Sequence, residues 1–300
     1  VVSEAVGIVV ALQANYLEVE LDQAPEQGLS RLLCTRRTRL SHRGETVHVG
    51  DRVRVEAIDP VQARAVVSEV QPRCSWLTRP QVANVSLVVV ALAVDQPAFD
   101  PDQASRFLLT AERTELPVQL LLTKGDLVEE DQRSALVERL MGWGYDAWVV
   151  SSQTGAGIDA LRQRLQDTEL AVLCGPSGVG KSSVLNRLMP HLALRVGAVS
   201  GRLQRGRHTT RHVELFPIAP GARVADTPGF NRPDLPDDPS ELGVLFPELR
   251  AQLSPWPCRF RNCLHRQEPG CGINRDWERF AFYKDALQEC SDISRPSRAG

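Results

Sequence analysis

Nine consecutive residues in the second half of the chain have the spacing of a phosphate-binding loop, or P-loop. They read Gly-x-x-x-x-Gly-Lys-Ser-Ser, after a strand-like segment at 170–174 and before a helix-like segment at 182–189. Glycines let backbone N–H groups approach phosphate oxygens closely, and the start of a helix adds its positive end. The residues expected to bind phosphates are Gly175, Pro176, Ser177, Gly178, Val179, Gly180, Lys181, Ser182 and Ser183.

Four residues in and after this loop have more specific expected roles. Lys181 is expected to reach the β and γ phosphates, and Ser182 is expected to coordinate Mg²⁺. Asp226 follows a strand candidate at 223–225 and is expected to hold the Mg²⁺ shell, while the N–H of Gly229 is expected to meet the γ-phosphate. A glycine-rich turn that binds nothing is the alternative. Lysine occurs only three times in the chain, so a chance match is improbable.

A second signal suggests which base is bound. Thr123, Lys124, Gly125 and Asp126 follow a strand candidate at 118–122 and resemble the (Asn/Thr)-Lys-x-Asp element of GTPases. In that superfamily the Asp carboxylate accepts from the ring N–H and the amine of guanine, and the Lys stem lies on the base. Thr123 stands where Asn is commoner, so we expect a weaker hydrogen bond to the P-loop.

A loop at 151–157, which begins with Ser151 and Ser152, resembles the segment that offers a backbone N–H to the guanine oxygen. The order of the motifs is unusual. Most GTPases have the P-loop first and the base-reading elements last, whereas here the base-reading elements precede the P-loop. The same sheet forms if the chain ends are moved, so the motifs predict a circularly permuted domain.

The basic, glycine-bearing segment 201–210 has the composition of a mobile switch loop. Thr210 is expected to join the Mg²⁺ shell in the GTP state. Phe230 follows the Asp-Thr-Pro-Gly run, where many GTPases carry a glutamine that orients water. Hydrolysis by the free protein is therefore expected to be slow. His208 is the nearest candidate for a group that positions water, and a surface or RNA-contacting histidine is the alternative.

Four metal-ligand side chains occur within 14 residues near the C-terminal end: Cys258, Cys263, His265 and Cys271. Three thiolates and one imidazole suit a tetrahedral Zn²⁺ with no open position, which is a structural rather than a catalytic site. The residues between them are too polar to bury the thiols in a core. This set also fits a reducing compartment better than a disulfide framework does.

The elements that position these residues fall into three regions. Five short strand candidates (6–10, 16–21, 29–34, 51–57 and 65–70) predict an oligonucleotide-binding (OB) barrel in residues 1–71, and an SH3-like barrel fits almost as well. Strands then alternate with helices, which predicts a mostly parallel α/β domain in residues 72–238. Residues 239–300 hold the Cys/His set and a last helix, expected at 274–290.

Composition bounds the partners and the location. Net charge is −2, but arginines cluster in three tracts that could face a polyanion such as RNA. No apolar run is long enough to span a membrane. The first residues include neither Met nor a basic leader, so we expect an earlier natural start and no secretory signal. We expect a cytoplasmic monomer.

Together and in this order, the segments 175–183, 206–210 and 226–230 and the Cys/His set resemble the ribosome-small-subunit-dependent GTPases of the RsgA family. The resemblance implies an OB barrel, a permuted GTPase domain and a zinc-binding tail. It also implies late maturation of the small ribosomal subunit as the role, with contacts to its rRNA and hydrolysis of GTP to GDP that the subunit stimulates. His208 is the catalytic residue that the resemblance implies.

Two other functions remain open at this point. A P-loop ATPase or kinase that acts on a small molecule would leave residues 123–126 and the Cys/His set unexplained. An RNA-binding module, in which the nucleotide only supports the structure, would show no rise in GTP turnover with small subunits.

Overall fold

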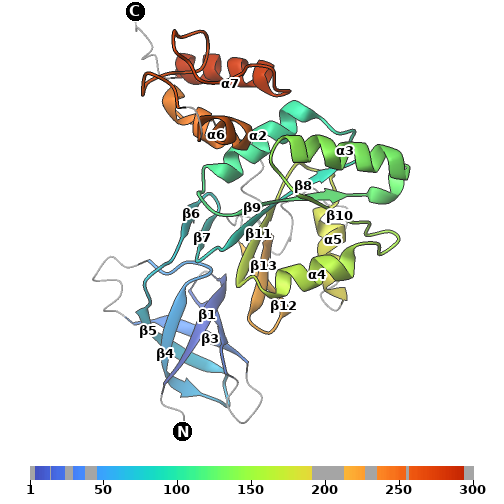
Figure 1. Ribbon diagram of the computed structural model, residues 1–300. Coiled ribbons are helices and arrows are strands. Elements are labelled where there is room, and N and C mark those ends of the chain that lie inside the picture. The colour runs from blue at the N-terminus through green and yellow to red at the C-terminus, as the bar shows by residue number, and fades with distance from the viewer. Residues whose placement is uncertain are drawn as a thin grey trace, which may run out of the picture. The chain divides into compact units, whose positions relative to one another are not determined.

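The computed structural model describes residues 4–13, 15–23, 30–37, 46–190, 213–226, 235–254 and 257–293 (Figure 1). The chain forms two compact units. The first consists of Val1–Val89, Ile158–Cys174 and Leu185–Asn231. The second consists of Val90–Gly157, Gly175–Val184 and Arg232–Gly300. Strand β8 (Leu87–Ala93) begins in the first unit and ends in the second.

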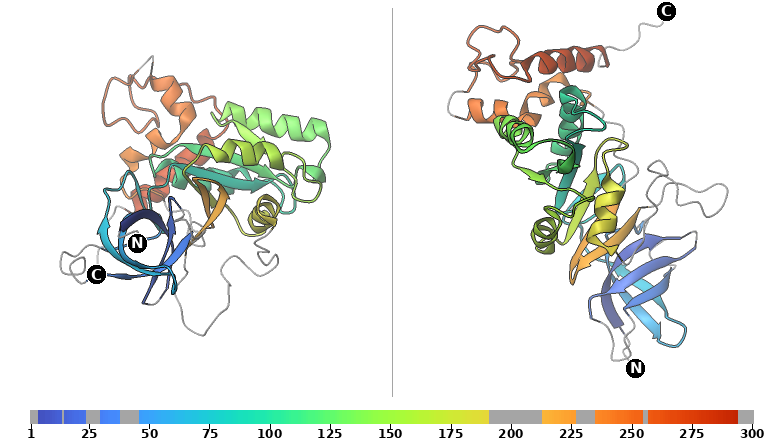
Figure 2. Two further views of the ribbon diagram at one scale, coloured as in Figure 1. Left: turned by 90° about the horizontal axis from the view of Figure 1, so that it is seen from below. Right: turned by 90° about the vertical axis from the view of Figure 1, so that its right-hand side faces the viewer.

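The N-terminal strands of the first unit close into a barrel, and Figure 2 shows them curving into a ring in its left view. The strands are β1 (Glu4–Leu12), β2 (Leu17–Leu21), β3 (Arg31–Arg36), β4 (Arg52–Asp59) and β5 (Arg64–Val70). Their order is β1-β2-β3-β5-β4, and β4 pairs back to β1. Alternate residues such as Leu17, Val19 and Leu21 fill the interior. This five-stranded closure is the one expected for an OB-like barrel.

The first unit also contains a short hairpin and part of the α/β sheet. Strands β6 (Trp76–Thr78) and β7 (Gln81–Ala83) form the hairpin, which the sequence pattern does not predict. Strand β11 (Leu170–Cys174) pairs in parallel with β13 (Ala222–Asp226), which pairs antiparallel with β12 (Glu214–Ala219). Helix α4 (Ile158–Gln166) contacts β12. Strand β12 pairs with β1 of the barrel, with Ala11 opposite Glu214.

The second unit contains the other α/β elements and the C-terminal region from residue 239 on, which we call the tail. Strands β10 (Ala147–Val149) and β9 (Val118–Thr123) are parallel, and β8 lies beside β9. The helices are α2 (Pro101–Glu112), α3 (Glu130–Gly142), the start of α5 (Lys181–Leu188), α6 (Pro247–Leu253) and α7 (Phe280–Ile293). Among the described residues of this unit, short 3-10 turns also occur at η1 (Gly125–Leu127), η3 (Pro239–Glu241) and η4 (Gly243–Leu245). None of the helices described is long and apolar enough to cross a membrane.

The tail helices pack on α2 around one apolar cluster, as Figure 1 shows in the arrangement of α2, α6 and α7. Phe246, Leu249, Tyr283 and Leu287 are buried there with Leu109 of α2. Helix α7 begins at Phe280, six residues later than the pattern predicts. Upstream of it the Asn274 side chain accepts a hydrogen bond from the N–H of Asp276, and this local turn replaces the first helical turn.

Candidate functional site

The predicted P-loop joins β11 to α5 and has a backbone that requires glycine. Gly175 has a φ of +137°, and a Cβ there would stand 2.0 Å from the carbonyl oxygen of Ala91. Gly178 and Gly180 also have positive φ, at +80° and +97°. The Lys181 Nζ donates to the carbonyl oxygens of Gly175 and Pro176, both at 2.7 Å, and the side chain is buried. An ammonium group therefore lies inside a curled loop, where nucleotide phosphates could replace the carbonyls as its partners.

Thr123 connects the base-reading element to the P-loop. Its hydroxyl donates to the carbonyl oxygen of Val179 at 2.5 Å and lies 3.2 Å from that of Leu92. A hydroxyl has only one proton to donate, so we assign the hydrogen bond to the nearer oxygen, that of Val179. The residue type predicts a weaker brace at this position. The hydroxyl nevertheless reaches the loop that the commoner asparagine would reach, and it is buried from water.

Lys124 lies over the same loop. Its φ is +58°, and its Nζ donates to the carbonyl oxygen of Gly178 at 2.9 Å and to that of Gln96. The lysine stem also passes close to Gly180, because a Cβ added at that glycine would be 3.6 Å from the Lys124 Cε. The methylene chain of Lys124 therefore lies beside the phosphate loop. A lysine that supports a nucleotide base needs this position.

Gly125 is fixed from two sides, while Asp126 stays accessible. The N–H of Gly125 donates to Val150 O at 3.0 Å, and Arg133 of α3 donates to Gly125 O at 2.9 Å. A Cβ on Gly125 would stand 2.8 Å from Val149 Cγ1, so no larger residue fits without a shift. The Asp126 side chain is exposed. No sequence pattern signals the Arg133 contact, because it is made to a backbone oxygen.

The loop at 151–157 closes on itself after β10. Ser151 is buried, its Oγ accepts from the N–H of Thr154 at 3.0 Å, and its N–H donates to Ala156 O at 2.9 Å. Ser152 is half-buried. The base-reading element, this loop and the P-loop all belong to the second unit and follow strand ends. Ligands in open α/β sheets bind outside the carboxyl ends of the strands, which is where these loops stand.

The remaining predicted nucleotide contacts are described only in part. Asp226 ends β13, where its backbone pairs in register with Glu214 and Leu173. Ser182 lies in the first turn of α5 and is half-buried. His208, Thr210, Gly229 and Phe230 lie outside the described residues. The magnesium set and the catalytic histidine therefore stay predictions.

The structure brings the four predicted metal ligands together. The donor atoms of Cys258, Cys263, His265 and Cys271 all lie within 4.8 Å of one another. The Nδ1 of His265 is 3.4 Å from the Cys258 Sγ and 3.7 Å from the Cys271 Sγ. Burial raises the pKa of the Cys263 thiol, and a bound cation would oppose this by stabilising the thiolate. The donor set fits a four-coordinate metal ion.

Packing holds the loop that carries these ligands. A Cβ on Gly243 would stand 3.1 Å from the Leu249 Cδ2 and 3.3 Å from the His265 Cδ2, so the glycine lets η4 lie close to the imidazole. The Tyr283 hydroxyl of α7 donates to Leu264 O at 2.9 Å, and Glu268 accepts from Leu264 N at 2.9 Å. Cys290, which is not among the predicted ligands, is buried in the core of the tail.

The sequence matches the model of the RsgA GTPase family over residues 70–236. It is 93% identical over 298 residues to the small ribosomal subunit biogenesis GTPase RsgA of Parasynechococcus marenigrum (strain WH8102), covering 99% of this chain and 100% of that protein. It is 74% identical to the protein of the same name from Synechococcus sp. (strain CC9605), covering 99% and 98%.

Two solved structures are similar along nearly the whole chain. One is YjeQ from Thermotoga maritima, with a TM-score of 0.79 and 30% identity over 98% of this chain and 100% of that one. The other is YloQ, described as a circularly permuted GTPase, with a TM-score of 0.77 and 27% identity over 98% and 96%. These likenesses, the five-stranded barrel and the Cys/His cluster confirm the predicted fold class.

Proposed function

Because this chain belongs to the RsgA GTPase family, and is therefore a hydrolase acting on GTP, we propose that it works on the small ribosomal subunit during the subunit's late maturation. In this proposal the subunit stimulates hydrolysis of GTP to GDP. The observation that carries it is the joining of a curled P-loop to a Thr-Lys-Gly-Asp element through Thr123 and Lys124. The near-identical relative is named for small ribosomal subunit biogenesis.

We assign roles to the residues of the nucleotide site that would touch the ligand, the Mg²⁺ or the attacking water. Residues 175–183, which include Lys181, would hold the phosphates. Asp126 would read the guanine edge and Lys124 would support the base. Ser151 and Ser152 shape the loop that meets the guanine oxygen. Ser182, Thr210 and Asp226 would hold Mg²⁺, which neutralises charge on the phosphates when bound. Gly229 would meet the γ-phosphate and His208 would position water.

We further propose that the metal of the tail is Zn²⁺, in a structural role. Three sulfur donors and one imidazole nitrogen within 4.8 Å of one another suit its tetrahedral preference. All four ligands would come from the protein, which leaves no position for substrate. Metal analysis of the purified chain should find about one zinc per chain. A folded tail without metal would contradict this assignment.

The remaining assignments are also proposals. We propose three domains, at 1–71, 72–238 and 239–300, and a monomer that contacts rRNA through its arginine tracts. We place the protein in the cytoplasm, because ribosome assembly and free cysteines both suit a reducing compartment.

The deciding experiment is GTP turnover by the full chain with and without purified small ribosomal subunits. We expect slow turnover alone and a rise that saturates with subunit concentration. Competition between GTP and ATP for binding runs beside it. Tighter ATP binding would point to a P-loop ATPase or kinase, and an unchanged rate with saturating subunits would point to an RNA-binding module with a structural nucleotide.

Two variants assign roles within the same assay. Asp126→Asn should weaken GTP binding and favour xanthosine triphosphate, because an amide cannot accept both guanine N–H groups. His208→Ala should keep GTP affinity and lose stimulated turnover. Unchanged GTP affinity in the first, or full stimulated turnover in the second, would remove that residue from its role.

A further inference from the structure

An exposed tryptophan stands on the hairpin that follows the barrel in the first unit. Trp76 begins β6 and retains 36% of its surface, although its neighbour Leu77 is buried. Trp76 and Thr78 are the exposed residues of this short strand. The indole therefore keeps part of its large apolar area open to a partner.

A guanidinium group is held rigidly against this indole. The Arg73 Cζ lies 4.7 Å from the centroid of the Trp76 ring. Arg73 also donates to both carboxylate oxygens of Asp51, at 2.7 and 2.9 Å, and to Thr46 O at 2.8 Å. Asp51 is fully buried, so the arginine cannot leave without stranding a buried charge. The cation and the ring therefore form one preorganised surface.

A second flat ring completes this surface. The ring of His48 meets that of Trp76 edge-on, with centroids 4.6 Å apart. Burial lowers the pKa of His48, and the nearby positive charges of Arg73 and Arg36 lower it further against the opposing effect of Asp51. The imidazole is therefore neutral at physiological pH and adds a flat polar ring. Arg36 is itself exposed at the end of β3.

We propose that His48, Arg73 and Trp76, with Arg36 beside them, form a docking surface for an unpaired RNA nucleotide. The base stacks on the indole or on the guanidinium plane, and Arg36 binds a phosphate. This inference rests on the proposed ribosomal function and names a surface for it. Aromatic faces and guanidinium planes are the usual partners of unstacked bases, and clustered arginines complement the backbone charge. A duplex offers no free base face except at its ends.

The test measures binding of the full chain to a 12-nucleotide single-stranded RNA and to a duplex of the same length, by fluorescence anisotropy. Trp76→Ala should weaken single-strand binding about 5- to 100-fold, the range of one lost stacking contact. Trp76→Phe keeps an aromatic face and should recover most of the affinity. Val61→Ala truncates another exposed apolar residue of the first unit and should change nothing. Arg36→Ala should lower the slope of log affinity against log salt by about 1.

The outcomes separate this inference from the proposed function. Unchanged single-strand binding in Trp76→Ala, or equal losses for single strand and duplex, would overturn the docking surface. Both results leave subunit-stimulated GTP turnover in the parent protein untouched. If stimulation is absent but single-strand binding still depends on Trp76, the surface stands and the ribosomal role falls. A thermal unfolding midpoint equal to that of the parent protein confirms that the variants are folded.

Discussion

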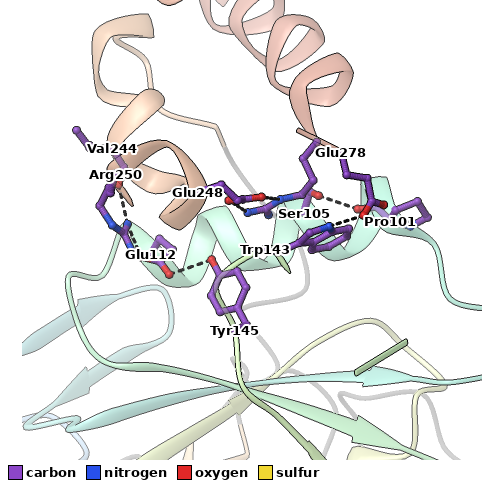
Figure 3. A network of polar contacts seen from close by, with 10 residues as sticks. Pro101, Ser105, Glu112, Trp143, Tyr145, Val244, Glu248, Arg250 and Glu278 are labelled. Atoms are coloured by element: carbon purple, nitrogen blue, oxygen red, sulfur yellow. Dashed lines mark hydrogen bonds and ion pairs between the residues drawn. The ribbon is translucent and has the colours of Figure 1, made fainter. Parts of the chain in front are cut away.

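The barrel and the tail are attached to their neighbours by different kinds of contact. In the first unit, β1 of the barrel pairs through its backbone with β12, and Arg223 of β13 donates to Glu20 of β2 at 2.7 Å. In the second unit, the tail meets α2 and the end of α3 through side chains (Figure 3). Backbone pairing tolerates many side chains, whereas a side-chain joint depends on particular residues.

The tail joint centres on a buried ion pair. Arg279 donates to both carboxylate oxygens of Glu248, at 2.7 and 2.5 Å, and the two side chains are only 2% and 7% exposed. The Arg279 Cζ also lies 4.6 Å from the ring centroid of Trp143 and 4.9 Å from that of Phe246. A delocalised cation can satisfy a carboxylate and two aromatic faces together, which an ammonium group does less well.

Weaker polar contacts surround this pair. The Trp143 Nε1–H donates to Glu278 at 2.8 Å. Glu112 of α2 accepts from the Tyr145 hydroxyl and from Arg250 of α6, both at 2.9 Å (Figure 3). The α3 end of the joint lies on the same helix as Arg133, which contacts the base-reading element. One helix therefore contacts both the predicted guanine site and the tail that carries the Cys/His cluster.

The largest effect should come from breaking the buried pair. Glu248→Ala leaves the Arg279 charge buried without its partner and should cost about 3–5 kcal/mol. Urea unfolding of the full chain measures it, with loss of α7 protection in hydrogen exchange as the local readout. The double variant Glu248→Leu/Arg279→Met should recover much of that loss. If the single variant costs under about 1 kcal/mol, the joint does not depend on this pair.

The barrel joint should tolerate the matching change better. Arg223→Ala removes a nearly buried cation from Glu20 but leaves the β1–β12 pairing in place, so we expect a cost of about 1–3 kcal/mol. Hydrogen exchange of the β1 amides should stay slow. Fast exchange there would show that the barrel also depends on its side-chain contact, and the contrast between the joints would be lost.

Among the ion pairs, the exposed one at the edge of the tail joint should contribute least to stability. Arg106 of α2 and Glu289 of α7 form a pair with side chains 35% and 44% exposed. Water screens such a pair, so Arg106→Ala should cost at most about 1 kcal/mol. The same urea titration checks it. A cost close to that of Glu248→Ala would mean that the burial of Arg279 is not what makes the centre strong.

Lowering the pH should weaken the tail joint and strengthen the barrel joint. These changes in stability should be smaller than those of the substitutions above. The hydrogen bond from Arg106 holds the pKa of Glu289 below its usual value, so its stabilisation is present at neutral pH and is lost as the pH falls through the folded-state pKa. Burial, and then the charge of Glu18, raise the pKa of Glu214 on β12. Its ionisation therefore destabilises the fold at neutral pH, and protonation relieves this.

Thermal unfolding of two variants checks these signs. At pH 7, Glu289→Gln should lower the midpoint and Glu214→Gln should raise it, each by about 1 °C. As the pH falls both differences should shrink, that of Glu214→Gln first because its pKa is raised, and that of Glu289→Gln only as the pH passes through its lowered folded-state pKa. Shifts of the same sign at pH 7 would contradict the contrast.

Much of the site was predictable because its chemistry depends on short-range spacing. The P-loop pattern fixes which backbone positions need positive φ, and Gly175, Gly178 and Gly180 have it. The Cys/His spacing anticipated a cluster that the fold brings together. Alternating apolar residues likewise predicted all five barrel strands, though the β6–β7 hairpin is too short to leave such a pattern.

The tertiary structure decided the contacts made between distant residues and to backbone atoms. No local pattern pairs Arg279 with Glu248, 31 positions away, or places Arg133 on the carbonyl of Gly125. Nor could the sequence show that the Thr123 hydroxyl reaches the P-loop, because that depends on how closely β9 approaches residue 179. Side-chain type and spacing determine what a loop can do. Only the packed fold determines which neighbour each charge and hydroxyl meets.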